Sequence, residues 1–307
     1  MKKICVLIPV IAAFLMSGCG KEYVRVGFAQ SGHESDWRTM SQDLAEEAFS
    51  RDKGFLLTVS DADNYEPYQT EAVRQFIDEK YDYIVIDPLP SEEWGSIFSE
   101  ADKAGIPVIL VNRHAAGAEG YSAWFGPDYT AEGRAAGQEI LKMADEDAVI
   151  YVIKGVEGSA AGEGRLEGLK EVLEDAGMGY KASSGDFTID GGRAAAEELA
   201  PEIKENPGIL VCMNDNMALG AMAALDSAGI TYGSEGSVKI ASFNGQYSGL
   251  KAVLDGRIAF DVESGPEAVL KAAEAISNNT ITDQENPNPV VIYTMDNLDP
   301  AIVEERK

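Results

Sequence analysis

Histidine and cysteine are scarce in this sequence, which has two histidines and three cysteines among 307 residues. No HExxH motif, CxxC pair or spaced group of three metal ligands occurs, which argues against a catalytic zinc site. The glycine-rich stretch at 162–165 lacks the P-loop lysine and the GxGxxG spacing, and GxSxG is absent. No nucleophile, base and orienting group can be assembled, so we predict a protein that is not an enzyme and that needs no cofactor or metal.

Basic residues are also in short supply, because 25 Lys and Arg stand against 52 Asp and Glu and leave a net charge of −27. So acidic a surface repels phosphate backbones, and nucleic acid is therefore not an expected partner. After the first residues, no apolar run is long enough to span a bilayer. The chain is nevertheless 45% hydrophobic, and its length predicts two domains of similar size, each with its own core.

The first residues have the pattern of a targeting segment. Two lysines precede an apolar run at 4–16, which is too short for a permanent membrane helix. The run ends on Ser-Gly-Cys, and residues 15–19 resemble a bacterial lipobox, in which signal peptidase cuts before a cysteine that carries lipid. We therefore predict a signal peptide at 1–18 and lipidation of Cys19. An ordinary signal peptide followed by an incidental cysteine is the alternative.

Lipidation would anchor the mature protein outside the cytoplasm, in the periplasm or on the outer face of the cell membrane. Cys5 leaves with the signal peptide, so Cys212 is the only free thiol and no internal disulfide can form. Cys212 lies in the apolar run 209–213, and we expect it to be a buried structural thiol.

Strand-like and helix-like segments alternate along the rest of the chain. Strands are expected at 23–29, 55–59, 83–86, 106–111, 121–125, 148–153, 180–187, 209–213, 238–243, 258–263 and 290–293. Segments with helical spacing separate most of them, and this alternation predicts an α/β fold with parallel sheets wrapped by helices. No Gly/Ser-rich linker divides the chain. The part after residue 260 is too small for a domain, so we expect it to run back across both sheets.

Hydrogen-bonding side chains follow nearly every predicted strand. In parallel α/β sheets, ligands bind beyond the carboxyl ends of the strands. The candidate ligand-binding residues near these ends are Glu34, Trp37, Arg38, Asp87, Asn112, Arg113, Arg165, Asn214, Asn244 and Glu263. Asp, Asn and Arg offer paired donors and acceptors that match the vicinal hydroxyls of a sugar, and Trp37 offers a flat face for ring C–H groups.

Each candidate also has a purely structural interpretation. Asn214 and Ser91 can cap helices, and Trp37 can fill a hinge. Asp87 and Glu263 can be solvated surface carboxylates. The case for a sugar site therefore depends on the whole set of residues and on no single member.

Several of these residues lie in longer motifs that resemble a known family. The segment GFAQSGHESDWR at 27–38 is similar to the first strand and loop of periplasmic sugar-binding proteins of the ribose/galactose-binding group. Its ESDWR portion resembles the galactofuranose-binding branch. The segments SGDFT at 184–188, NDNMALGA at 214–221 and FNG at 243–245 match the same group. The likeness extends from about residue 24 to residue 293.

The resemblance implies two Rossmann-like lobes joined by three hinge strands, the type I periplasmic binding protein fold. The lobes would comprise 19–127 plus 262–290 and 128–261 plus 291–307. A monosaccharide, galactofuranose-like as the first choice, would bind between them and be delivered by a monomer to ABC permease subunits in the membrane. The implied contacts are Glu34, Trp37, Arg38, Arg113, Arg165, Asn214 and Glu263. Asn112 and Asn244 stand where the family usually has aspartate, and because asparagine also donates, they leave the sugar open.

Two other functions fit parts of the sequence. A sugar-sensing receptor that signals through a membrane partner would have the same ligand-binding lobes. Repressors of the LacI type share the fold but begin with a DNA-binding head, whereas this chain begins with a signal segment. An extracellular enzyme on a Rossmann-like frame ranks last, because the catalytic groups are missing.

Overall fold

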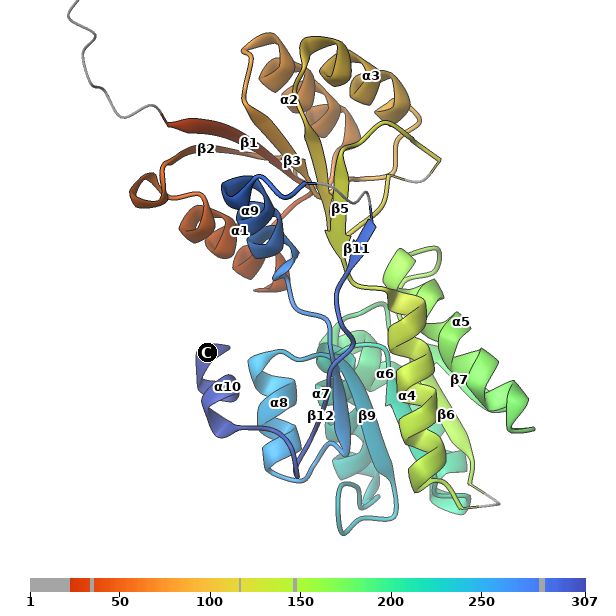
Figure 1. Ribbon diagram of the computed structural model, residues 1–307. Coiled ribbons are helices and arrows are strands. Elements are labelled where there is room, and N and C mark those ends of the chain that lie inside the picture. The colour runs from red at the N-terminus through yellow and green to blue at the C-terminus, as the bar shows by residue number, and fades with distance from the viewer. Residues whose placement is uncertain (1–22, 34–35, 116, 146–147, 282–284) are drawn as a thin grey trace, which may run out of the picture.

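The computed structural model describes residues 23–33, 36–115, 117–145, 148–281 and 285–307. They form two lobes, one above the other in Figure 1, and each lobe is built on a six-stranded sheet flanked by helices. Most neighbouring strands are parallel, which confirms the α/β class predicted from the alternation. Within the described ranges, none of the helices combines the length and the apolar character that crossing a membrane requires.

The N-terminal lobe carries a sheet in the order β11-β5-β4-β3-β1-β2. Its strands are β1 (Val24–Gln30), β2 (Phe55–Asp61), β3 (Tyr83–Ile86), β4 (Val108–Val111), β5 (Ala123–Gly126) and β11 (Glu285–Pro287). Its helices are α1 (Asp36–Ala48), α2 (Glu66–Asp78), α3 (Trp94–Ala104) and α9 (Ala268–Asn278), with a short 3₁₀ turn at Arg51–Lys53. Apolar residues of α1 and α9 cover one face of the sheet, and those of α2 and α3 cover the other.

The C-terminal lobe repeats this plan with a sheet in the order β12-β10-β9-β8-β6-β7. Its strands are β6 (Ile150–Lys154), β7 (Tyr180–Ser184), β8 (Ile209–Cys212), β9 (Lys239–Asn244), β10 (Phe260–Glu263) and β12 (Ile292–Thr294). Its helices are α4 (Tyr129–Met143), α5 (Ala160–Asp175), α6 (Ile189–Glu205), α7 (Asp215–Ala228), α8 (Tyr247–Leu254) and α10 (Pro300–Glu305). Only the pairing of β12 with β10 is antiparallel among the described ladders of this lobe.

The chain passes between the lobes after β5, after β10 and after β11 (Figure 1). The second passage carries it from the end of β10 to α9, which packs against α1 of the other lobe. The third carries it back from β11, an edge strand beside β5, to β12 beside β10. Each passage begins at the carboxyl end of a strand, at Gly126, Glu263 or Pro287, so these strand ends lie at the junction between the lobes.

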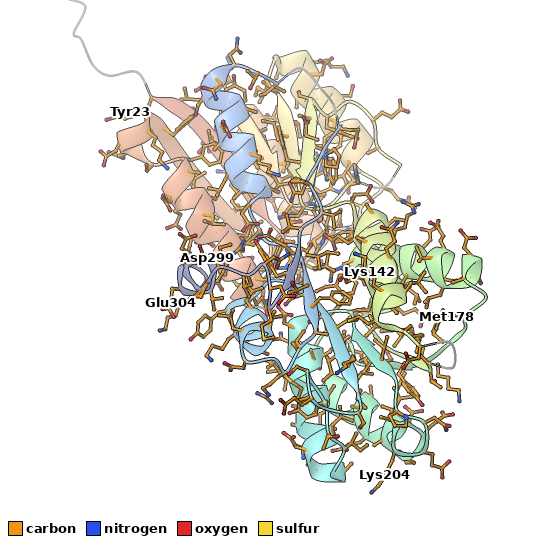
Figure 2. The ribbon with its side chains drawn as sticks, turned by 60° about the horizontal axis from the view of Figure 1, so that its bottom comes forward. Tyr23, Lys142, Met178, Lys204, Asp299 and Glu304 are labelled. Atoms are coloured by element: carbon orange, nitrogen blue, oxygen red, sulfur yellow. The ribbon has the colours of Figure 1, made fainter. Side chains whose placement is uncertain are left out.

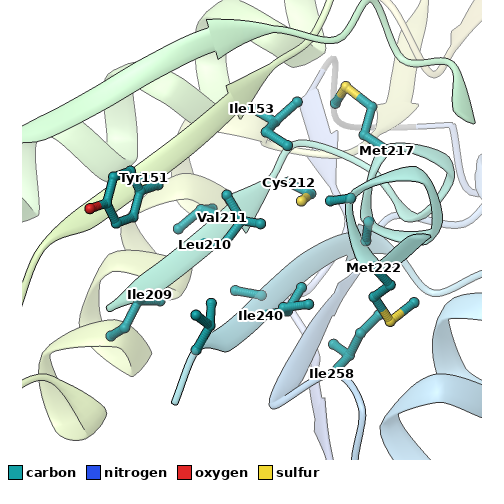
Figure 3. Close-up of a cluster of buried hydrophobic side chains, with 14 of the residues drawn as sticks. Tyr151, Ile153, Ile209, Leu210, Val211, Cys212, Met217, Met222, Ile240 and Ile258 are labelled. Carbon is teal, nitrogen blue, oxygen red and sulfur yellow. The ribbon is translucent and has the colours of Figure 1, made fainter. Parts of the chain in front are cut away.

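The apolar runs of the sequence become the interiors of the two lobes. In the C-terminal lobe, Tyr151, Ile153, Val211 and their neighbours are completely buried between the sheet and its helices (Figure 3). Cys212 lies within this cluster as a free, fully buried thiol, which confirms the sequence-based prediction. Burial raises the pKa of that thiol well above its usual range, so it packs as a small apolar side chain.

Three details differ from the sequence-based expectations. β11 and α10 were not anticipated, because a three-residue strand with the sequence Glu-Asn-Pro and a six-residue helix are too short for a periodic signal. The expectation that Ser91 caps the following helix is wrong, since α3 begins at Trp94 and a turn intervenes. Ser91 instead accepts from the backbone N–H of Glu93 at 3.0 Å and donates to Glu66 at 2.5 Å.

Candidate ligand-binding site

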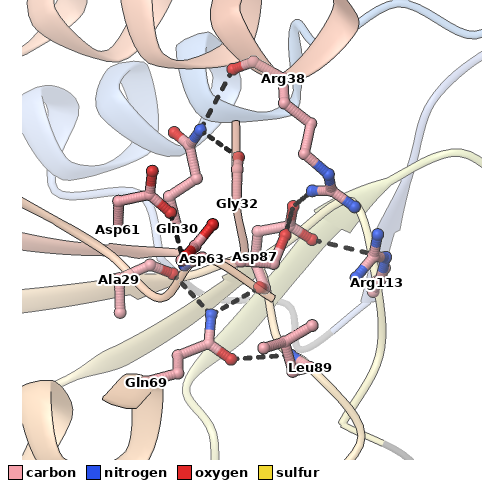
Figure 4. Close-up of polar contacts among 11 residues, drawn as sticks. Ala29, Gln30, Gly32, Arg38, Asp61, Asp63, Gln69, Asp87, Leu89 and Arg113 are labelled. Carbon is pink, nitrogen blue, oxygen red and sulfur yellow. Dashed lines mark hydrogen bonds and ion pairs between the residues drawn. The ribbon is translucent and has the colours of Figure 1, made fainter. Parts of the chain in front are cut away.

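A group of charged side chains gathers at the carboxyl ends of β1, β3 and β4 (Figure 4). Arg38, in the first turn of α1, pairs through Nη1 with Oδ2 of Asp87, and both side chains are buried. Arg113 follows β4 with its Nε 3.9 Å from Oδ1 of Asp87, while its side chain remains 31% exposed. Ser31 adds a hydroxyl donor at 3.2 Å from Oδ2. Asp87 is therefore not a solvated carboxylate, and it holds two arginines at one strand end.

Amide side chains fix the loops that carry this group. Nε2 of the buried Gln69 donates to the carbonyls of Ala29, at 3.1 Å, and Asp87, at 2.9 Å, and its oxygen accepts from the N–H of Leu89 at 2.7 Å. Gln30 donates to the carbonyl of Gly32 at 2.7 Å. Backbone groups that the strands leave unpaired at their ends are thus satisfied within the protein, which stabilises the loop geometry.

Asn112 lies at the end of β4, only 2% exposed, with its backbone in the left-handed region at φ 63°. Its N–H donates to the carbonyl of Phe125 at 2.8 Å. Among the described residues, neither its side-chain oxygen nor its side-chain nitrogen has a hydrogen-bond partner. A buried amide without partners costs on the order of 1–3 kcal/mol for each group, so this side chain is one that a polar ligand would satisfy.

Arg165 is the centre of the corresponding group in the C-terminal lobe. Its guanidinium is 2% exposed and donates to Glu132 at 2.9 Å, to the carbonyl of Met213 at 2.6 Å and to Oδ1 of Asn244 at 2.9 Å. It also lies over the ring of Phe243, 4.8 Å from its centroid. Arg165 therefore fixes the orientation of the Asn244 side chain. The backbone of Asn244 has a φ of 111°, which few residues other than glycine adopt.

Glu132 was not anticipated as a member of the site, because a glutamate in the first turn of a helix is common there and is usually solvated. It lies on α4, and its side chain is 3% exposed. Burial raises the pKa of this carboxyl, and the adjacent Arg165 guanidinium counteracts the shift. Each charge of the Arg165–Glu132 pair neutralises the other, which offsets part of the free-energy cost of burying both.

Asn214 caps the N-terminus of α7, which is the structural role that the sequence offered beside ligand binding. As the N-cap of α7 it accepts from the N–H of Met217 at 2.9 Å, and its amide nitrogen donates to the carbonyl of Phe187 at 3.0 Å. Both ends of the side chain have protein partners, so any contact with a ligand must use the second N–H of the amide or the remaining acceptor capacity of its oxygen.

Behind Asn244 lies a completely buried pair of carboxyl groups, Asp215 and Asp261. Asp215 accepts from the hydroxyl of Ser242 at 2.5 Å and from the N–H of Gln246 at 2.8 Å. Asp261 accepts from the N–H of Gly245 at 3.1 Å. Burial and the negative charge of Asp215 raise the pKa of Asp261 well above its usual range, so the pair shares a proton beneath the turn that presents Asn244.

Trp37 and Glu263 lie at the second passage between the lobes. The indole N–H of Trp37 donates to the carbonyl of Ser264 at 2.9 Å, which joins α1 to the passage. Glu263, at the end of β10, accepts from the Tyr293 hydroxyl at 3.2 Å and pairs with Arg306. Trp37 and Glu263 therefore contact hinge elements in this conformation. Glu34 and Cys19, which were also predicted from the sequence, lie outside the described residues.

Tyr129, at the start of α4, connects the two charged groups. Its partly buried ring lies 5.4 Å from the guanidinium carbon of Arg165. Burial raises the pKa of its phenol, and the charges of Arg165 and Glu132 in one lobe and of Asp87 and Arg38 in the other all act on it. The strand-end rule misses Tyr129 because it follows a passage between lobes, and its place in the sequence gives no further signal.

A family model described as a periplasmic binding protein domain matches residues 26–297. The galactofuranose-binding protein of Escherichia coli is 28% identical over 285 residues, which cover 90% of this chain and 88% of that protein.

Two solved structures are also similar. The binding protein of the arabinose ABC transporter from Shewanella, bound to L-arabinofuranose, is 27% identical with a TM-score of 0.80, covering 92% of this chain and 95% of that one. A Mycobacterium smegmatis protein in complex with β-D-fucofuranose is 28% identical with a TM-score of 0.75, covering 89% and 92%.

Two lobes with parallel sheets, three short passages and polar strand ends that face one junction define a two-lobed binding protein. The match over most of the chain shows that it belongs to the periplasmic binding protein family. The resemblance drawn from its motifs is thereby confirmed. As a member of this family it is a binding protein and not an enzyme.

Proposed function

We propose that this protein is the extracytoplasmic solute-binding component of an ABC importer and that it captures a monosaccharide between its lobes. The three relatives described above are named for, or were crystallised with, galactofuranose, arabinofuranose and fucofuranose. Five-membered sugar rings are common to all three. We therefore propose a furanose as the ligand, with galactofuranose as the first choice.

The observation that carries the proposal is the unsatisfied amide of Asn112 beside the exposed face of Arg113. Among the described residues no protein atom pairs with that amide, although it is 2% exposed. Both amide atoms are closed to solvent in this conformation, so a small shift of the side chain or its loop would bring them to a ligand, where one sugar hydroxyl satisfies the oxygen and another the nitrogen. A phosphate or carboxylate ligand would satisfy only the donor.

The nearby arginines do not by themselves call for an anionic ligand. Arg38 and Arg165 are each paired with a buried carboxylate, Asp87 and Glu132. Their charge is therefore largely balanced within the protein. Remaining N–H groups of such paired guanidinium groups still donate well to neutral hydroxyls. Within the proposed site, Arg113 and Asn112 from one lobe and Asn244 and Tyr129 from the other are the groups best placed to contact a ring.

Titration calorimetry with purified protein tests the proposal. D-Galactose, which equilibrates with its furanose form in solution, L-arabinose, D-ribose and inorganic phosphate would be injected separately at neutral pH. Micromolar binding corresponds to about 8 kcal/mol, or roughly 0.7 kcal/mol for each of about twelve heavy atoms in a hexose, which is within the range for small ligands. Binding of phosphate with no binding of any sugar would overturn the proposal.

The proposal includes the location of the protein. Lipidation of Cys19 would hold it at the membrane, close to the permease that receives the sugar, and the folded part would act as a monomer. This part of the proposal rests on the lipobox-like end of the signal segment and on the transporter named for one relative.

A sensor that signals through a membrane partner is the alternative. It would bind the same sugar through the same residues, so calorimetry does not separate the two functions. Sugar uptake by cells that lack the protein does, because loss of uptake indicates import, whereas normal uptake with a lost response to the sugar indicates sensing.

A further inference from the structure

The last helix of the described chain brings an arginine to the second passage between the lobes. Figures 1 and 2 show α10 beside the C-terminal lobe, and in Figure 1 its C-terminal end is turned towards the junction. There Arg306 pairs through Nη2 with Glu263 and through Nη1 with Glu267. Glu263 ends β10 in the C-terminal lobe, and Glu267 is the residue before α9 in the N-terminal lobe. One guanidinium therefore spans the passage.

The surroundings of this contact are crowded and largely shielded from solvent. The side chains of Arg306, Glu263 and Glu267 are 14%, 20% and 29% exposed. A Cβ placed on Gly265 would lie 2.1 Å from a carboxylate oxygen of Glu267, so that carboxylate is folded back onto the passage itself. Two carboxylates held this close in a partly buried place repel each other unless a cation separates them.

A second donor completes the setting of Glu263. The hydroxyl of Tyr293, on β12, donates to Glu263 Oε2 at 3.2 Å, while Arg306 holds the other oxygen. Burial and the negative charge of Glu263 raise the pKa of Tyr293 to about 12, so its hydroxyl keeps its proton at neutral pH. Both oxygens of Glu263 are thus fixed by residues that follow the third passage of the chain.

We propose that Arg306 is a positioning residue of the sugar site, which orients Glu263 and, through Glu267, sets the shape of the passage between β10 and α9. The inference rests on the proposed function, because it takes Glu263 as a group that faces the ligand. Arg306 itself acts through these two carboxylates and does not touch the sugar.

The planar fork of the guanidinium explains why an arginine stands here. It donates to two carboxylates at once in a fixed geometry, whereas an ammonium group at the same place is a single point of charge. Arg306→Lys should therefore still neutralise the two carboxylates but hold Glu263 less firmly in its orientation. Arg306→Gln should lose both.

Calorimetric titration of the sugar into matched variants tests the positioning role. Arg306→Gln should weaken binding at least tenfold, and Arg306→Lys should recover part of the loss. Lys307→Gln is the control, because Lys307 is exposed, lies on the same tail and pairs only with Glu304 among the described carboxylates, at 3.4 Å. Equal affinities of Arg306→Gln and Lys307→Gln would overturn the inference while leaving the proposed function intact.

A double-mutant cycle shows whether Arg306 acts through Glu263. In a Glu263→Gln background, Arg306→Gln should weaken binding less than threefold further, because the group that it orients has already changed. If the two substitutions weaken sugar binding independently, so that the double mutant loses the product of the two single fold-changes, the mechanism is contradicted. A merely structural role would produce such independent losses.

Hydrogen exchange in the ligand-free protein tests the same contact without any sugar. The N–H of Glu263 bonds to Val291 at 2.9 Å, and that of Ser264 bonds to Asn244 at 3.3 Å. Arg306→Gln should accelerate exchange of these two amides, and Lys307→Gln should not. If wild-type protein binds no sugar, the proposed function fails, and unchanged exchange would then reject the role of Arg306 as well.

Discussion

The buried pair of Asp215 and Asp261 gives a prediction in which two similar substitutions have opposite outcomes. Asp215 accepts from Ser242 and from Gln246, so both of its oxygens serve as acceptors. Asp261 accepts from Gly245 through Oδ1, and its Oδ2 has no donor among the described residues, so Oδ2 is the oxygen that can carry the shared proton. Asp261 therefore acts as a donor to Asp215, as an asparagine amide would.

Asp261→Asn should consequently be tolerated, because the amide both accepts and donates as the acid does, and near pH 4 its free energy of unfolding should differ from that of wild type by no more than about 1 kcal/mol. Asp215→Asn should lower the free energy of unfolding by about 2 kcal/mol. Whichever way the new amide turns, a buried donor from Ser242 or Gln246 loses its acceptor, at a cost of about 1–3 kcal/mol. Asp102→Asn, exposed on α3, is the control.

The pH dependence follows from the raised pKa of Asp261. The folded state holds a proton that an unfolded aspartate releases near pH 4, so the stabilisation is complete below that pH and is lost as pH rises through the folded pKa. Between these limits the contribution falls by about 1.4 kcal/mol per pH unit. Asp261→Asn carries no such proton. Its free energy of unfolding, relative to that of wild type, should therefore rise by about 1.4 kcal/mol for each pH unit between these limits.

Urea unfolding of wild type, Asp261→Asn, Asp215→Asn and Asp102→Asn at several pH values between 4 and 8 measures these effects. Parallel stability curves for wild type and Asp261→Asn would refute the shared proton. Equal destabilisation by Asp215→Asn and Asp261→Asn at pH 7 would refute the assignment of donor and acceptor.

Three further predictions concern the anchor, the ligand and the lobes. Cys19→Ala should move the protein from the membrane to the soluble fraction, as followed by immunoblotting; unchanged membrane retention would contradict lipidation. Arg113→Ala should weaken sugar binding at least tenfold in calorimetry, about 1.4 kcal/mol, because its exposed guanidinium is available to hydroxyls, and exposed Arg134→Ala is the control. Saturating sugar should reduce the radius of gyration in solution scattering, since hinge closure is the usual response of periplasmic binding proteins; an identical profile would indicate a rigid molecule.

The fold could be predicted from the sequence because its signal is local and repeated. Short apolar runs such as 209–213 alternate with helical segments throughout both lobes, and that alternation admits few arrangements other than parallel sheets with helices. The elements that could not be predicted are short, or they form only because of partners far away in the sequence. β11 has three residues, and it is a strand only because β5 offers an unpaired edge beside it.

The candidate site was predictable to the same degree and for the same reason. The strand-end rule correctly placed Asp87, Asn112 and Asn244 at the carboxyl ends of their strands, because parallel strands all end at one edge. Whether each side chain is available to a ligand depends on partners far away in the sequence. Arg165 is engaged by Glu132, 33 residues earlier, and by Asn244, 79 residues later.

These distant partners also explain why polar residues in such number are compatible with a stable junction. Arg165 and Glu132 balance each other, Asp261 carries the proton that lets it lie beside Asp215, and Arg306 separates Glu263 from Glu267. Each buried or half-buried charge thus has a partner within the protein, as burial requires. Among the candidates from the sequence that the structure describes, the amide of Asn112 is the buried group whose side-chain atoms have no such partner. Arg38 and Arg113 share the carboxylate of Asp87, so the balance in the N-terminal lobe is partial. A site whose charges are mostly paired within the protein and whose remaining unsatisfied buried group is a neutral amide favours a neutral, hydroxyl-rich ligand over an ion.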